Sequence, residues 1–281
     1  MKLSRRQFIK FSTTAFAGLI ATPSIYLVAS NELNHPVVKT TRVPIRDLPE
    51  AFHGFRIVAM TDFHLYPYAR PDLIQKAVAL ANQLKPDLGV FLGDYVWQDE
   101  DAIFDLAPIL AGLDAKHGIY SVIGNHDIWA DVERVKLGLR ESRIPLLLNQ
   151  GLQINKGDSK INLVGLDDGW SGHPDLNQAY EGLPENTPTI MLLHEPDLAD
   201  QYAHDPRVSL MLAGHTHGGQ VRFNNKPIIA PYLGKKYNWG LFKVGDLWLY
   251  TSAGVGVISV PIRYNCPPEV SEIILVPNES P

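Results

Sequence analysis

The stretch Phe55-Arg56-Ile57-Val58-Ala59-Met60-Thr61-Asp62-Phe63-His64 contains the pattern that decides the fold of this chain. Six mostly apolar residues, 55–60, have the composition of a buried strand. A short turn follows at once and carries an aspartate and a histidine. In α/β proteins, the side chains that bind ligands lie just beyond the carboxyl ends of the strands. The stretch therefore predicts both a strand and one corner of a functional site.

Four more apolar runs, at 88–92, 119–123, 189–193 and 208–213, end in the same way. The polar residues that follow them are Gly93-Asp94, Gly124-Asn125-His126-Asp127, His194 and Gly214-His215-Thr216-His217. One polar residue after a strand is more often a turn residue or a helix cap. Together, however, the five turns hold five of the chain's ten histidines. They indicate a divalent-metal site built from oxygen and nitrogen ligands.

The segments between these runs predict an α/β fold. Helices are expected at 71–84, at 102–113 with a kink at Pro108, and at 131–142. A hairpin is expected over 152–166 with its turn at 156–159, and further strands at 248–252 and 273–276. The stretch before residue 55 contains Pro36, Pro44 and Pro49, and predicts an irregular lead. Because the chain has neither an internal repeat nor a long linker, residues 31–281 are predicted to form one domain.

Residues 1–30 have a different composition. They contain four basic residues and no acidic residue, and an apolar stretch runs over 11–28. The order Ser4-Arg5-Arg6-Gln7-Phe8-Ile9-Lys10 resembles the twin-arginine signal, which directs folded proteins to export. We expect export by the twin-arginine machinery to the periplasm, the cell wall or the outer face of the membrane. The sequence leaves open whether the segment is cleaved or kept as an anchor.

Composition excludes several other classes of protein. Of 281 residues, 45% are hydrophobic and 20% are charged, which excludes a disordered chain. The single cysteine, Cys266, excludes an internal disulfide and a thiolate metal cluster. Removing residues 1–30 changes the formal net charge from −5 to −9, and this acidic balance argues against a nucleic-acid partner. Gly169-Trp170-Ser171-Gly172-His173 ends in His where a serine-hydrolase elbow requires Gly.

The order D-x-H, G-D, G-N-H-D, H and G-H-x-H resembles the calcineurin-like metallophosphoesterases. The motifs at 194–197, 214–220 and 263–269 are similar to those of the exported phosphodiesterases of the YkuE/YaeI type. The resemblance covers nearly all of the chain after residue 31. It implies an α/β fold in which two mixed β-sheets form a sandwich that is flanked by helices.

The resemblance also implies a site with two divalent metal ions, which would be Mn, Zn, Fe or Co. One ion would be bound by Asp62, His64 and His217, and the other by Asn125, His194 and His215, with Asp94 bridging the two. In this family a hydroxide that bridges the two ions attacks the phosphorus. His126 resembles the catalytic residue that stabilises or protonates the leaving oxygen.

The implied function is hydrolysis of a phosphodiester or pyrophosphate bond. The substrate would be a small molecule, a lipid precursor or a cell-wall polymer. One alternative is a lipid pyrophosphatase that acts on a substrate of the UDP-2,3-diacylglucosamine type. A non-enzymatic alternative is a metal-binding envelope protein. The sequence leaves peripheral contact with the membrane and the oligomeric state open.

One position departs from the family pattern. Many members have Asp or Asn three residues after the bridging aspartate, where it orients the catalytic histidine, but this chain has Trp97. Asp99, Asp101 or Asp127 could take that role, or His126 could be oriented in another way. Asp127 could equally be a turn cap.

Overall fold

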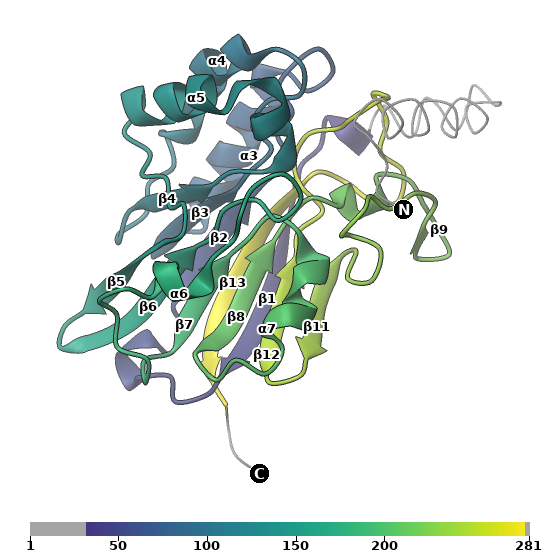
Figure 1. Ribbon diagram of the computed structural model, residues 1–281. Helices are drawn as coiled ribbons and strands as arrows, with labels where there is room; N and C mark the ends of the chain where they lie inside the picture. The colour runs from purple at the N-terminus through teal and green to yellow at the C-terminus, as the bar shows by residue number, and fades with distance from the viewer. Residues whose placement is uncertain (1–31, 279–281) are drawn as a thin grey trace.

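Two main β-sheets pack face to face in this computed structural model, which describes residues 32–278 (Figure 1). The first sheet has the strand order β1 (Val37–Ile45), β13 (Glu269–Pro277), β2 (Arg56–Met60), β3 (Leu88–Leu92) and β4 (Ile119–Val122). In this sheet β13 is antiparallel to β2, and the other neighbours run parallel. The segment proposed as an export signal or anchor, residues 1–30, lies outside the described residues.

The second sheet is also mixed. Its order is β11 (Gly240–Val244), β12 (Leu247–Thr251), β8 (Val208–Ala213), β7 (Thr189–Leu192), β6 (Ser159–Gly165) and β5 (Gln150–Lys156). The two edge pairs, β11–β12 and β5–β6, are antiparallel, and the central strands are parallel. A separate two-stranded ribbon consists of β9 (Arg222–Phe223) and β10 (Lys226–Pro227). The predicted hairpin at 152–166 is confirmed by β5 and β6.

Helices cover the outer faces of both sheets (Figure 1). The α-helices are α3 (Pro71–Gln83), α4 (Ile103–Leu110), α5 (Asn125–Glu141), α6 (Leu176–Ala179) and α7 (Ala199–Tyr202). Short 3-10 helices are η1 (Glu50–Phe52), η2 (Glu100–Ala102), η3 (Pro196–Leu198) and η4 (His217–Gly219). Helices α3, α4 and α5 pack on the first sheet, and α6 and α7 pack on the second. Among residues 32–278, no helix is long and apolar enough to cross a membrane.

The alternation of side chains along the strands divides the apolar residues among three layers. In β2, Ile57 and Ala59 face the layer between the two sheets, whereas Val58 and Met60 face α3 and α4. In β8, Leu210 and Leu212 face the same central layer. Because successive residues of a strand point to opposite faces, a run that is apolar throughout predicts a sheet buried on both sides. The observed sandwich therefore confirms the expected fold class.

The structure corrects two local expectations. Helix α5 begins at Asn125 rather than at residue 131, and its backbone leaves the helical region at Asp131, with φ −157° and ψ 101°. The Asp131 carboxylate accepts hydrogen bonds from the backbone N–H groups of Glu133 and Arg134, so it caps a second helical segment. The expected irregular lead contains β1, which is an edge strand and therefore tolerates Pro44.

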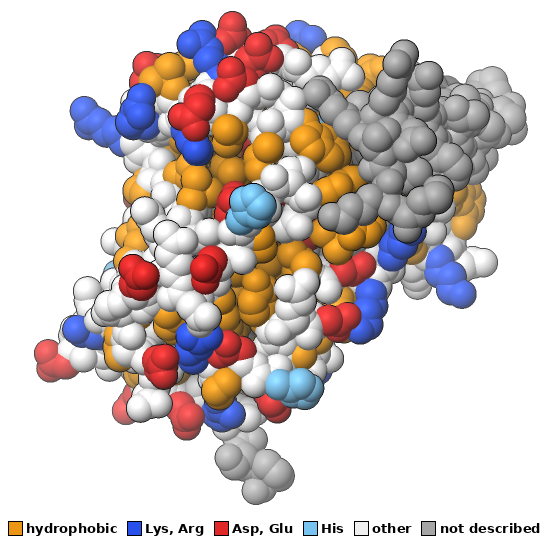
Figure 2. All heavy atoms as spheres, in the orientation of Figure 1, with side chains coloured by type: hydrophobic (Ala, Val, Ile, Leu, Met, Phe, Trp, Pro, Cys, Tyr) orange, Lys and Arg blue, Asp and Glu red, His pale blue; other side chains and the backbone are white. Residues whose placement is uncertain are grey.

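Charged side chains gather over α4 and α5 and along the lower rim of the face in Figure 2. Hydrophobic side chains gather in the middle of the same face. The carboxyl ends of the central strands of both sheets lead into this middle region (Figure 1).

Candidate metal centre

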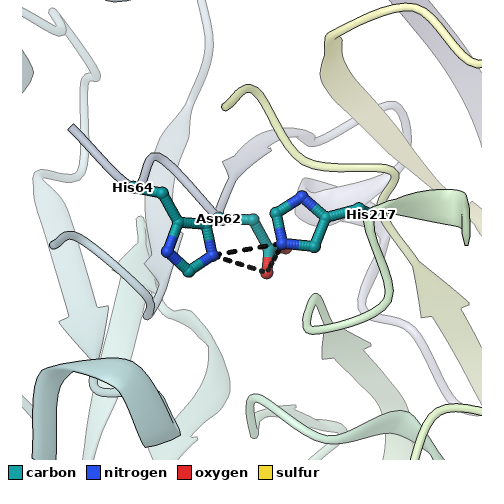
Figure 3. A group of neighbouring side chains, drawn as sticks. All are labelled: Asp62, His64 and His217. Atoms are coloured by element: carbon teal, nitrogen blue, oxygen red, sulfur yellow. Dashed lines mark hydrogen bonds and ion pairs between the residues drawn. The ribbon is translucent and has the colours of Figure 1, made fainter. Parts of the chain in front are cut away.

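The five polar turns predicted from the sequence meet at the carboxyl ends of β2, β3, β4, β7 and β8. Two sheets therefore contribute to one site. Asp62, His64 and His217 form the first group that could hold a metal ion (Figure 3). Asp94, His194 and His215 form the second such group. Within each group the candidate ligand atoms lie within 4.8 Å of one another, and all six residues are buried.

Asp94 belongs to the second group, but its carboxylate also faces the first. Its Oδ2 atom is 3.4 Å from Nε2 of His64 in the first group and 3.1 Å from Nε2 of His194 in the second. Nε2 of His64 is also 3.1 Å from Nε2 of His217. A single carboxylate oxygen thus faces imidazole nitrogens that the chain delivers from both sheets. This placement is compatible with the bridging role that the family resemblance implied for Asp94.

The polar atoms of the site fit a cation. Both side-chain polar atoms of Asn125 are buried and have no hydrogen-bond partner within residues 32–278, although buried amides are nearly always paired. Nδ1 of His194 donates to the carbonyl of Leu92 at 2.6 Å, and Nε2 of His215 donates to the carbonyl of Tyr232 at 2.7 Å. These bonds leave the other nitrogen of each ring available as a metal ligand whenever the ring is neutral.

Burial and crowding keep most of these imidazoles neutral. Burial lowers the pKa of His64 to about 3, and burial together with His194 lowers the pKa of His215 to about 3. His194 differs: burial disfavours its charge, but Asp94 and Asp62 outweigh burial and raise its pKa well above the usual range. Burial raises the pKa of Asp62 to about 7. Two carboxylates and four imidazoles that are buried this close together form a donor set that suits a divalent ion.

The turns that carry the site are strained. Five site residues have a positive φ, which is uncommon outside glycine: Asp62 (54°), His64 (43°), Asp94 (57°), His215 (73°) and His217 (51°). Such strain persists where the surrounding structure enforces it, and it concentrates at functional sites.

The sequence profile of the calcineurin-like phosphoesterase family matches residues 55–219, which contain all five turns. The chain belongs to this family. It is 33% identical over 284 residues to the metallophosphoesterase YkuE of Bacillus subtilis (strain 168), and the match covers 98% of each chain. It is 35% identical over 230 residues to the phosphodiesterase YaeI of Escherichia coli (strain K12), covering 79% of this chain and 82% of YaeI. A transmembrane protein with a metallophosphoesterase domain from Bos taurus is 30% identical over 277 residues, covering 93% of this chain and 62% of the bovine protein.

In this phosphoesterase, Asp127 holds the loop that carries Asp94. Its Oδ2 atom accepts from the N–H groups of Asp94 and Gly124, both at 2.9 Å. Its Oδ1 atom accepts from the N–H groups of Tyr95 at 2.8 Å and Val96 at 3.3 Å. Of the two roles that the sequence left open, the structure therefore places Asp127 as a cap for two neighbouring turns.

Asp99 and Asp101 are exposed and engaged elsewhere. The Asp99 carboxylate accepts from the N–H of Asp101, and the Asp101 carboxylate pairs with Arg134 at 2.6 Å. Trp97 is buried and lies against Tyr68, with ring centroids 5.6 Å apart. Trp97 therefore packs in the protein interior.

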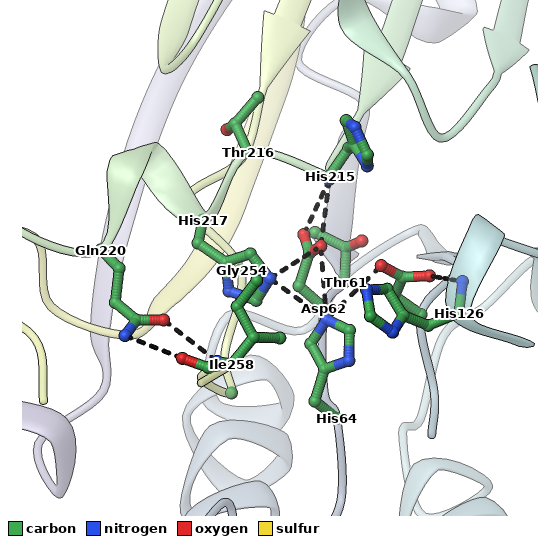
Figure 4. A network of polar contacts seen from close by, with 12 residues as sticks. Thr61, Asp62, His64, His126, His215, Thr216, His217, Gln220, Gly254 and Ile258 are labelled. Carbon is green, nitrogen blue, oxygen red and sulfur yellow. Dashed lines mark hydrogen bonds and ion pairs between the residues drawn. The ribbon is translucent and has the colours of Figure 1, made fainter. Parts of the chain in front are cut away.

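His126 lies at the edge of the two groups (Figure 4). Its backbone N–H donates to Oδ1 of Asp94 at 2.9 Å, which ties the start of α5 to the shared carboxylate. Its ring packs edge-on against His64, with centroids 4.8 Å apart and planes at 85°. The ring of Trp129 lies on another side at 4.8 Å. His126 is therefore fixed next to the Asp94 carboxylate, which faces ligands of both groups.

The loop after β12 supports Asp62, a role that no sequence motif indicated. The N–H groups of Val255 and Gly256 donate to the carbonyls of Thr61 and Asp62. A Cβ atom at Gly254, where φ is +70°, would lie 2.6 Å from Cβ of Asp62. Only glycine fits this close approach without strain.

Arg263 holds that loop from within. Its guanidinium group is fully buried and donates to the carbonyls of Ala253, Gly254, Gly256 and Cys266. The motif at 263–269 was noticed in the sequence, but its structural reason, a buried cation bound by main-chain carbonyls, depends on the folded loop.

Cys266 supports the other side of the first group. Its thiol donates to the carbonyl of His217 at 3.2 Å, and burial raises the pKa of this thiol. A protonated, buried thiol acts as a packing residue.

The basic side chains of Arg222 and Lys236, which follow β8 in the chain, have protein partners. Arg222 is buried and donates to the carbonyls of Gly218 and Asn225 and to the side chain of Asn238. Lys236 pairs with Asp200 on the surface at 2.7 Å. These contacts assign both cations to local structure.

Proposed function

We propose that this protein is an exported, metal-dependent phosphodiesterase whose site holds two divalent ions. The ligands would be Asp62, His64 and His217 for one ion and Asn125, His194 and His215 for the other, with Asp94 shared between them. The observation that carries the proposal is the position of Asp94 Oδ2, which lies 3.4 Å from His64 Nε2 and 3.1 Å from His194 Nε2.

When bound, two divalent ions would neutralise the anionic phosphate oxygens and lower the pKa of water at the site, so that hydroxide is available near neutral pH. The chain's own residues supply the orientation. Asp94 sets the separation of the two halves, and its hydrogen bond to the N–H of His126 fixes that residue at the edge. From there the imidazole of His126 would donate a proton to the leaving oxygen of the ester.

Membership of the family and the likeness to the phosphodiesterase YaeI support hydrolysis of a phosphoester. The test uses purified protein from which metal has been removed and to which Mn²⁺ or Zn²⁺ is then added. It should hydrolyse bis-p-nitrophenyl phosphate only after metal is added. Asp94→Asn and His215→Ala should each lower kcat/KM by about 100-fold or more, because outer-shell changes alone commonly cost 10- to 100-fold.

The matched control is His173→Ala, because His173 is exposed and belongs to neither group. Full metal-dependent activity in Asp94→Asn would refute the mechanism. Elemental analysis separates the non-enzymatic alternative, since a metal-binding envelope protein would bind metal and hydrolyse none of the diesters or pyrophosphates offered. A UDP-linked diacylglucosamine lipid in the same panel tests the lipid pyrophosphatase alternative.

The proposal that the protein is exported rests on residues 1–30. Replacing Arg5 and Arg6 with Lys should keep the basic charge and abolish export if the twin-arginine machinery reads this pair. Fractionation of cells that express the protein with and without the change measures the result. Export that continues in the doubly substituted protein would contradict the proposed route.

A further inference from the structure

Three aromatic side chains line one side of the candidate site. Trp129 lies on α5, three residues after His126, Trp170 lies in the loop after β6, and Tyr232 lies in the loop before β11. We call these three residues the aromatic wall. Centroids of Trp129 and Trp170 are 4.8 Å apart, and those of Trp170 and Tyr232 are 5.4 Å apart. The planes of neighbouring rings are at 80° and 66°, so each ring meets the next edge to face and the three form one row.

The aromatic wall adjoins both kinds of site residue. The ring centroids of Trp129 and His126 are 4.8 Å apart, and those of Trp170 and His215, a member of the second group, are 5.7 Å apart. The main chain of Tyr232 also accepts the hydrogen bond that orients His215. A molecule that touched the wall would thus lie beside the edge where His126 acts.

The wall is no part of the protein's apolar cores. Its three residues are only half-buried, and none belongs to the four apolar clusters of residues 32–278. Large aromatic side chains that remain partly exposed next to a site are typical of ligand-binding surfaces. Two other tryptophans do not belong to the wall: Trp97 is buried, and the Trp239 indole donates to Glu269.

The wall is also held rigidly. The Glu195 carboxylate accepts from the N–H of Gly169 at 2.8 Å, and the Asp168 carboxylate accepts from the N–H of Trp170 at 3.0 Å. The indole N–H of Trp129 donates to the hydroxyl of Ser171 at 2.8 Å, which joins α5 to the loop. A preformed surface loses little conformational entropy when it binds a ligand.

We propose that the aromatic wall is a subsite for the planar ring of a nucleoside carried by one ester group of the substrate. This inference rests on the proposed phosphodiesterase function and narrows its substrate class. Stacking on aromatic side chains favours flat rings. Half-buried Asp167 and Ser171 and exposed His173 stand in the same loop as Trp170, so polar groups that could bind the sugar or the polar edge of a base accompany the rings.

The test compares two substrates that differ only in the base: uridine 5′-(methyl phosphate) and ribose 5-(methyl phosphate). Stacking of one base contributes about 1–3 kcal/mol, so kcat/KM for the uridine ester should exceed that for the ribose ester by about 5- to 150-fold. Trp170→Leu should reduce this ratio to near 1, and Trp170→Phe should retain most of it. Trp248→Ala, a half-buried tryptophan on β12, is the matched control and should keep the wild-type ratio.

Binding supplies a second measurement that needs no turnover. The protein without added metal should bind uridine 5′-monophosphate more tightly than ribose 5-phosphate in equilibrium dialysis, and Tyr232→Leu should reduce that preference. Equal kcat/KM for the two esters in the wild type, or an unchanged ratio in a folded Trp170→Leu variant, overturns the subsite. Hydrolysis of neither ester nor of bis-p-nitrophenyl phosphate with any metal instead overturns the proposed function.

Discussion

Replacing Asp127 should damage the site without removing any candidate ligand. The carboxylate is fully buried and accepts four main-chain N–H groups, two on each oxygen. A hydrogen bond to a charged group contributes about 1.5–3 kcal/mol, so four would nominally sum to about 6–12 kcal/mol. Relaxation of the loop limits the loss, and Asp127→Ala should lower the free energy of unfolding by about 3–5 kcal/mol.

Asp127→Asn should lie between this variant and the wild type. Its one carbonyl oxygen can still accept from one pair of N–H groups, whereas its NH₂ group faces the other pair. We expect Asp127→Asn to lower the free energy of unfolding by about 2–3 kcal/mol. Because the N–H of Asp94 is among the four, both variants should also bind less metal.

Urea unfolding of the metal-free protein gives the free energies, and elemental analysis after dialysis against Mn²⁺ gives the metal content. Asp99→Asn is the matched control, since this exposed carboxylate accepts from the N–H of Asp101 alone and should change stability by less than about 0.5 kcal/mol. Asp127→Asn with the stability and metal content of the wild type would refute the reasoning that Asp127 holds the turns.

Three further predictions concern other parts of the site. Burial and the neighbouring Asp168 raise the pKa of Glu195 well above its usual range, so the contribution of Glu195 to stability should be greatest below about pH 4.5 and fall as the pH rises toward its folded-state pKa. In metal-free protein, Glu195→Gln should reduce the fall in Tm between pH 5 and 8. The control variant Glu181→Gln, which changes an exposed glutamate, should leave that fall unchanged. Gly254→Ala should lower the free energy of unfolding by more than Gly157→Ala, because both glycines have a positive φ but only at position 254 would a Cβ atom meet Asp62. We expect Gly157→Ala to cost about 1–2 kcal/mol. Equal losses for the two variants in urea unfolding would contradict the close approach of Gly254 to Asp62. Adding Mn²⁺ at about 100 times its Kd should raise the free energy of unfolding of the metal-free protein by about 2.7 kcal/mol, which is measured as a rise in Tm. An equal rise in Tm for Asp94→Asn would show that the metal binds elsewhere.

The positions of the central strands could be predicted because their chemistry is local. Runs such as 88–92 and 208–213 are apolar throughout, and only a sheet covered on both faces buries such runs as strands. The turns that follow carried Asp and His, so the gathering of Asp62, Asp94 and His215 followed from the rule that strand ends meet at one edge. Two strands of the main sheets, β1 and β11, escaped prediction because they lie at sheet edges, where polar residues and Pro44 are tolerated. The two-residue strands β9 and β10 were not predicted either.

The start of α5 and the supports of the site could not be read from the sequence. Asp131 does cap a helical segment, as its sequence context suggested, but the preceding turn from Asn125 exists because Asp127 binds the N–H groups of a distant loop. Arg263 and Gly254 act through carbonyls and close approaches that exist only after folding. The aromatic wall likewise joins Trp129, Trp170 and Tyr232 from three separate loops and helices, and its only local sign was the spacing of Trp129 from His126.

The placement of the site across two sheets has a consequence for the order in which the protein assembles. His64 and His217, whose Nε2 atoms are 3.1 Å apart, are separated by 153 positions in the chain. Contacts of such long sequence separation form late, because closing the intervening loop costs entropy that local contacts cannot offset. During synthesis, the first group of ligands cannot come together until β8 and the turn after it have left the ribosome and β8 has paired in its sheet. Metal capture should therefore mark the end of folding, and a chain truncated before residue 208 should bind no ion at either group.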